Sequence, residues 1–225
     1  MGQSRQGLGA GSMTVTTPSG KSPATLAQVP AWAHAAGAVL LIALQVAVLH
    51  GFGQPLVAAS GHILLWVGNP LSPDTSQQLS DWYSFSHFIH GMIFFGLLRW
   101  MAPRLPLGAR LLIAMAIEIT WEFAENSPAV IRHYRQQALA AGYAGDSVLN
   151  SVCDTLTMSA GFFFTSMVRA RYVITLALGL EIFTAVCIRD NLTLNVINLI
   201  APAGWAPVRA IHAWQAAGLT PDAGR

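Results

Sequence analysis

The stretch GDSVLNSVCDTLTMSAGFFF, residues 145–164, decides the fold class because it joins a polar stripe to an apolar end typical of a membrane helix. Asp146, Asn150 and Asp154 follow one another at intervals of four residues. On a helix this spacing places all three side chains within about 80° of each other, on one face. Carboxylates are costly in a bilayer, so the pattern predicts that this face meets other polar groups rather than lipid.

The composition of the whole chain indicates a membrane protein. Of the 225 residues, 53% are hydrophobic and only 10% are charged, whereas a soluble domain has about 25% charged residues. Apolar runs of roughly the length that crosses a bilayer occupy 32–52, 82–101, 109–126, 146–168 and 172–188. We therefore predict an all-α, polytopic membrane helix bundle with about five transmembrane helices. The shorter, mixed run at 192–202 is predicted to be interfacial or re-entrant.

The ends of the chain differ from its middle. Residues 1–30 are rich in Gly, Ser, Thr and Pro, which predicts a disordered tail. Residues 31–216 are predicted to form a single membrane helix-bundle domain, and 217–225 a flexible C-terminal tail. Arginines gather in two of the connectors, at Arg99, Arg104, Arg110, Arg169 and Arg171. Because positive charge favours the cytoplasmic side, we expect these connectors and the N-terminus to be cytoplasmic.

The ionisable residues of four predicted spans lie near the opposite, outer end of the bundle. Such residues normally face the interior of a bundle and pair with one another. Glu118, Glu122 and Glu125 share one helix face by their spacing. We therefore expect a polar pocket that opens to the outer side, lined by His87, His90, Glu122, Asn150 and Asp154.

Two chemistries fit this pocket. Asp154 and Glu122 could share a proton and activate water, with His90 as a third catalytic candidate. Alternatively, a divalent metal cofactor could be held by His87, His90, Glu122 and Asp154. Asn150, Asp146, Asn126 and Arg189 are the candidates for binding substrate. Asp146 is equally explained as a helix N-cap, and the whole cluster as a structural hydrogen-bond core.

Four motifs carry a resemblance to a known family. DWYSFSHFIHG, WEFAENSPAVIRHYR, GYAGDSVLNSVCDT and IRDNLTLNVINLI occur in this order between residues 81 and 200, and the resemblance extends from about Gly61 to Gln215. They resemble an uncharacterised family of bacterial multi-pass inner-membrane proteins, catalogued as a domain of unknown function. The resemblance implies the inner membrane and the bundle fold, but no reaction. Family members carry a cysteine pair where this chain reads PLVAASG, which argues against an essential thiol there. The Asp146 and Asn150 pattern is also similar to VanZ-like membrane proteins.

The sequence leaves open whether the protein is an enzyme. One hypothesis is a hydrolase or transferase that acts on a lipid-linked substrate at the periplasmic face. The alternative is a non-enzymatic membrane scaffold, assembly factor or binding protein whose polar cluster is structural. A transporter is least favoured, because no inverted repeat is found. The expected partners are membrane lipids and either a lipid-linked substrate or a membrane protein. The net charge of +2 gives no indication of nucleic-acid binding.

Overall fold

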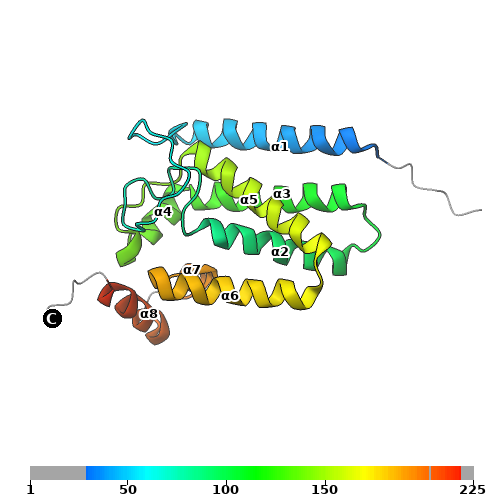
Figure 1. Cartoon of the computed structure of the whole chain (residues 1–225). Coiled ribbons are helices and arrows are strands. Elements are labelled where there is room, and N and C mark those ends of the chain that lie inside the picture. Colours follow the sequence, from blue (N-terminus) through cyan, green and yellow to red (C-terminus); the bar gives the residue numbers. More distant parts are fainter. Residues whose placement is uncertain (1–28, 203, 219–225) are drawn as a thin grey trace, which may run out of the picture. The chain divides into compact units, whose positions relative to one another are not determined.

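A computed structural model describes residues 29–202 and 204–218, and the chain is helical wherever it forms a regular element there. The elements are α1 (Ala31–Gly51), α2 (Ser84–Met101), α3 (Leu107–Glu125), α4 (Pro128–Tyr134), η1 (Ala138–Ala140), α5 (Val148–Met167), α6 (Ala170–Ile188), α7 (Leu192–Ile200) and α8 (Ala206–Ala217) (Figure 1). The predicted all-α class is confirmed for these residues. The predicted tails, at 1–28 and 219–225, lie outside the described residues.

The five long helices coincide with the five apolar runs of the sequence. Proline and polar residues set their ends: Pro106 is the N-cap of α3, and Pro128 opens α4 three residues after α3 ends. Among the helices that the structure describes, only α1 and α6 are long and apolar enough to cross a membrane by length and composition. The polar stripes of α2, α3 and α5 lower the hydropathy of these helices. The structure therefore supports two candidate spans, and the predicted number of about five is not confirmed.

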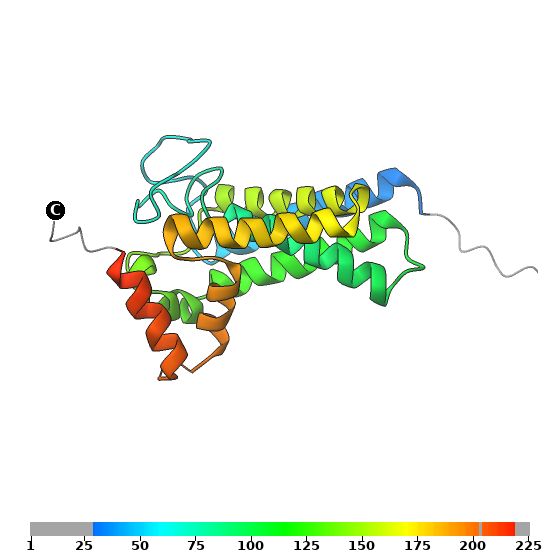
Figure 2. The ribbon, with the colours of Figure 1, turned by 60° about the horizontal axis from the view of Figure 1, so that its bottom comes forward.

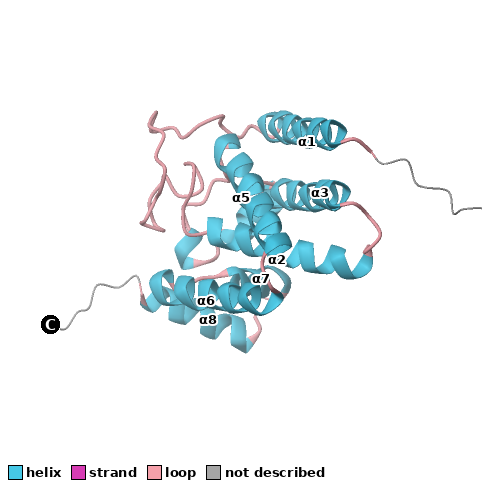
Figure 3. Ribbon diagram, turned by 45° about the vertical axis from the view of Figure 1, so that its right-hand side comes forward, coloured by secondary structure: helices cyan, strands magenta, loops and turns pink. Residues whose placement is uncertain are grey.

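Helix α5 crosses α2 obliquely at close range (Figures 1 and 3). Two glycines allow this approach. A methyl group on Gly91 would overlap the carbonyl oxygen of Met158, and one on Gly161 would overlap that of Phe88. Met158 lies at the crossing and is fully buried in the apolar core. Small residues that let helix backbones meet are typical of packing in membrane proteins.

The polar end of the bundle, where α1, α3 and α6 end and α2 and α5 begin, is covered by the loop of residues 52–83 together with α4, α7 and α8 (Figure 2). The loop is anchored on the first turn of α5. The backbone N–H of Val148 donates to the carbonyl of Pro55 at 2.8 Å, and that of Ser147 donates to Ser76 at 3.0 Å. These bonds satisfy N–H groups that the start of a helix leaves without partners. The loop therefore forms a fixed cap beside the predicted polar pocket.

Candidate functional site

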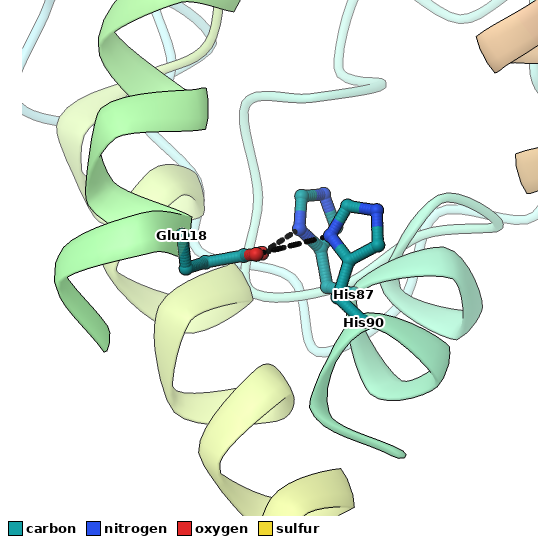
Figure 4. Close-up of side chains that lie close together, drawn as sticks. All are labelled: His87, His90 and Glu118. Atoms are coloured by element: carbon teal, nitrogen blue, oxygen red, sulfur yellow. Dashed lines mark hydrogen bonds and ion pairs between the residues drawn. The ribbon is translucent and has the colours of Figure 1, made fainter. Parts of the chain in front are cut away.

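Glu118 on α3 joins the two histidines of α2 (Figure 4). Its Oε1 lies 2.5 Å from Nδ1 of His87, and its Oε2 lies 3.0 Å from Nδ1 of His90. Both imidazoles point toward the carboxylate, which has no exposed surface. An ionised carboxylate only accepts hydrogen bonds, so each histidine donates through Nδ1.

His87 also approaches the two carboxylates that the sequence singled out. Its Nε2 lies 3.8 Å from Asp154 Oδ2, and its Nδ1 lies 3.6 Å from Glu122 Oε1. One donor atom from each of His87, Glu122 and Asp154 lies within 4.8 Å of the others. Asp154 Oδ1 accepts from Ser84 Oγ at 3.2 Å. The convergence of these three predicted residues, from three different helices, is thus present in the structure.

Glu122 is held from behind by a buried polar chain. Its Oε2 accepts from Ser151 Oγ at 2.5 Å, and that hydroxyl accepts from Gln45 Nε2 at 2.8 Å. Gln45 Oε1 in turn accepts from Thr155 at 3.1 Å. The other carboxylate oxygen, Oε1, has no hydrogen-bond partner among the described residues, although Glu122 is only 1% exposed. A buried unpaired oxygen of this kind is uncommon and calls for an explanation.

A cavity of about 830 Å³ opens at the polar end of the bundle, and His87 and Asp154 form part of its wall. Three tyrosines and further carboxylates also line it: Tyr83, Tyr134, Tyr143, Asp74, Glu125, Asp146 and Asp190. None of the described lining residues is lysine or arginine. His90 instead lines a separate cavity of about 390 Å³, beside Phe94 and Trp121. A pocket is therefore present with His87 and Asp154 in its wall, whereas His90, Glu122 and Asn150 are not among the described residues that line it.

Asp146 is the only predicted substrate-binding residue that lines the large cavity. Its Oδ2 accepts from Asn126 Nδ2 at 2.7 Å, and its Oδ1 accepts from Tyr143 at 3.0 Å. Burial raises the pKa of Asp146 to about 6, against the lowering effect of these two hydrogen bonds. It is not the N-cap of α5, because Ser147 accepts from the backbone N–H of Asn150.

The other three predicted substrate-binding residues make structural contacts, and Asn126 is the one that holds Asp146. Asn150 donates through Nδ2 to the carbonyl of Gln78 at 2.8 Å, which fixes the covering loop to α5. Arg189 ends α6 with φ of 57° and donates to the carbonyl of Trp214 at 2.8 Å. None of the three is among the described residues that line the large cavity. A role for them in binding substrate stays a prediction.

Sequence reasoning left Glu118, Asp190 and the cavity tyrosines out of the site. Glu118 carried a usable signal, since it shares a helix face with Glu122. Asp190 follows α6 and accepts from the Tyr83 hydroxyl at 3.3 Å, and burial raises its pKa to about 7. Its position in the cavity depends on the fold of the segment that follows α6, which local spacing does not encode.

Comparison with known proteins now identifies the family. The family model described as "Protein of unknown function (DUF2585)" matches residues 49–217. The chain belongs to this family. A UPF0314 protein of Sphingopyxis alaskensis is 50% identical over 80% of this chain and 94% of its own length. Another, from Rhizobium johnstonii, is 47% identical over 82% of this chain and 91% of its own length. No solved structure matches. The resemblance to an uncharacterised bacterial family is confirmed, and the similarity to VanZ-like proteins is not shown.

Proposed function

We propose that this DUF2585 protein is an integral inner-membrane enzyme, a hydrolase or transferase that acts on a lipid-linked substrate. In this proposal, about five helices cross the membrane, the N-terminus is cytoplasmic and the large cavity opens to the periplasm. The family itself gives no reaction. The proposal therefore depends on the surface of the bundle and on the groups in the cavity wall.

The outer surface of the long helices favours a membrane. Helices α1 and α6 are long and apolar, and most of their residues are not buried inside the protein. Leu40 on α1 is 69% exposed and Val186 on α6 is 77% exposed. Apolar side chains continue over the exposed faces of the other long helices, at Ile93, Leu97, Ile117, Leu156 and Phe163. Exposed apolar side chains in this number are typical of a surface that a lipid or protein partner covers.

The observation that carries the proposal is the pairing of His87 with Asp154 in the wall of the 830 Å³ cavity. Cavities that bind small ligands usually have volumes of about 300–1,000 Å³. A histidine and a carboxylate within reach of a bound substrate are the groups that general acid–base catalysis uses. An opening at the end of a membrane bundle lets a polar head group enter while its lipid chains remain in the bilayer.

A specific observation also favours the non-enzymatic alternative. The chain from Glu122 through Ser151 to Gln45 ties α3, α5 and α1 together with buried hydrogen bonds. The contact between Asn126 and Asp146 does the same for the ends of α3 and α5. A scaffold, assembly factor or binding protein would need these contacts for its architecture alone.

Complementation of a deletion strain separates the two functions. We expect the envelope lipids of the deletion strain to accumulate one lipid-linked species, and the wild-type protein to reverse this. Asp154→Asn should fail to reverse it while reaching the wild-type level in the membrane. Glu181→Gln is the matched control, because this carboxylate binds backbone N–H groups at the start of α7 and does not line the cavity. Full reversal by Asp154→Asn, or unchanged lipids in the deletion strain, would reject the enzyme and leave the scaffold.

A further inference from the structure

We propose that His87, Glu122 and Asp154 bind one divalent transition-metal ion, either Zn²⁺ or Mn²⁺, and that Glu118 positions His87 for this role. The catalytic use of the ion rests on the proposed function. Its binding does not, and it can be measured separately. The inference begins from the oxygen of Glu122 that lacks a partner.

The unpaired Oε1 of Glu122 lies beside the His87 ring, and His87, Glu122 and Asp154 each place one possible ligand atom within 4.8 Å of the others. Oε1 lies 3.6 Å from Nδ1 of His87, which is too long for a hydrogen bond, and this nitrogen already contacts Glu118. A buried carboxylate oxygen without a donor costs free energy on the order of 1–3 kcal/mol or more. The second oxygen of Glu122 is already fixed by Ser151, which holds Oε1 beside His87. A cation at this place would remove the penalty.

The spacing between His87 and Asp154 also fits a shared ion. With Nδ1 donating to Glu118, Nε2 is the ring nitrogen of His87 that is left to bind an ion, and it lies 3.8 Å from Asp154 Oδ2, which is too far for a hydrogen bond. Zinc bonds to nitrogen and oxygen are about 2.0–2.2 Å long, which separates two tetrahedral ligands by about 3.4 Å. The three donor atoms, all within 4.8 Å of one another, would draw together by about 1 Å on binding.

Glu118 and His90 have different positions relative to this site. His87, His90 and Glu118 also lie close enough to suggest a metal group. However, they already contact one another at 2.5 and 3.0 Å, which are hydrogen-bond distances that leave no space for an ion (Figure 4). The His90 ring stacks on Phe94 and meets the edge of Trp121 in the smaller cavity. We therefore replace the four predicted ligands by three, and place Glu118 behind His87.

The donor set indicates the kind of metal. One imidazole and two carboxylates suit Zn²⁺ and Mn²⁺, whereas soft metals prefer thiolates. A carboxylate that accepts from the second nitrogen of a ligating histidine is the usual support of such a site. Since His87 and Asp154 line the large cavity, the remaining coordination positions would face it. A water or a phosphate or acyl oxygen of the substrate could take them.

The test measures metal content and affinity in the full chain. The protein is purified in detergent without a histidine tag, stripped with EDTA and dialysed against Zn²⁺ or Mn²⁺, and bound metal is determined by elemental analysis and competitive titration. We expect about one ion per chain. His87→Gln, Glu122→Gln and Asp154→Asn should each retain less than about a tenth of it, while Glu118→Gln should bind about 10–100-fold more weakly. His90→Gln is the matched control and should bind as the wild type does.

Thermal unfolding of each variant separates loss of a ligand from loss of the fold. The inference is overturned if the wild-type protein binds neither metal, if a folded Glu122→Gln binds normally, or if a folded His90→Gln loses as much metal as His87→Gln. If the wild-type protein binds about one ion per chain but the lipids of the deletion strain are unchanged, the metal site is supported and the proposed enzyme function is rejected. If the lipids of the deletion strain change but the wild-type protein binds no metal, the metal site is rejected and the proposed enzyme function is supported.

Discussion

The glycine crossing of α2 and α5 supports a quantitative prediction, because it also sets the distance between His87 and Asp154. Each of these residues lies about one helical turn from the crossing, on opposite helices. A methyl group at Gly91 would lie 2.5 Å from the nitrogen of Phe162 and 2.9 Å from the carbonyl carbon of Met158. Non-bonded carbon contacts are favourable at about 3.5–4.0 Å, so Gly91→Ala requires the two helices to separate by about 1 Å.

Overpacking by one methyl group typically destabilises a protein by about 1–3 kcal/mol. The upper part of this range applies here, because the obstructing atoms are backbone and cannot rotate away. Replacing a helical glycine by alanine returns up to about 1 kcal/mol. Gly96→Ala is the matched control on the same helix, since its methyl group would meet nothing within 4 Å. We therefore expect the two variants to differ by about 3 kcal/mol, or about 6–12 °C in melting temperature for a chain of this size.

Thermal unfolding in detergent, followed by tryptophan fluorescence, measures this difference. Gly161→Ala should behave as Gly91→Ala does, because its methyl group would meet the carbonyl of Phe88 on α2. Metal affinity should fall in both variants and not in Gly96→Ala, as His87 and Asp154 move apart. Equal melting temperatures for Gly91→Ala and Gly96→Ala would refute the close crossing and the site geometry built on it.

Two further predictions concern buried polar groups. Burial raises the pKa of Asp190 to about 7, above the value of about 4 for an exposed aspartate. Between about pH 4 and pH 7 the folded state therefore keeps a proton on Asp190 that the unfolded state has lost. The stability that this protonated carboxyl contributes is fully present below about pH 4 and is lost as the pH rises to about 7. Melting temperatures across this range should fall more steeply for the wild type than for Asp190→Asn; parallel curves would contradict the shift. Ser151→Ala leaves Glu122 Oε2 and Gln45 Nε2 each without a hydroxyl partner, and should lower the free energy of unfolding by about 1–3 kcal/mol in urea titrations. An unchanged midpoint would show that this chain is not coupled to folding.

Local sequence was sufficient to predict where the long helices begin and end. Apolar runs of bilayer length, bounded by Pro106 and Pro128, predicted the long helices to within a few residues, because run length and helix-breaking residues act locally. The stripe of Asp154 and Asn150 correctly predicted a buried helix face that meets polar groups. The number of membrane spans was harder to predict, because the same polar stripes lower the hydropathy of the helices that carry them.

The sequence by itself determined that histidine and carboxylate side chains would gather at one end of a helical bundle. Only the tertiary structure decided which of them meet. Glu118 and Glu122 share a face of α3, and spacing alone could not tell which one bonds the histidines. His87 and His90 are one turn apart, yet they line different cavities. The reason is that the angle and depth at which α2 meets α3 and α5 depend on contacts between distant residues, such as those of Gly91 and Gly161.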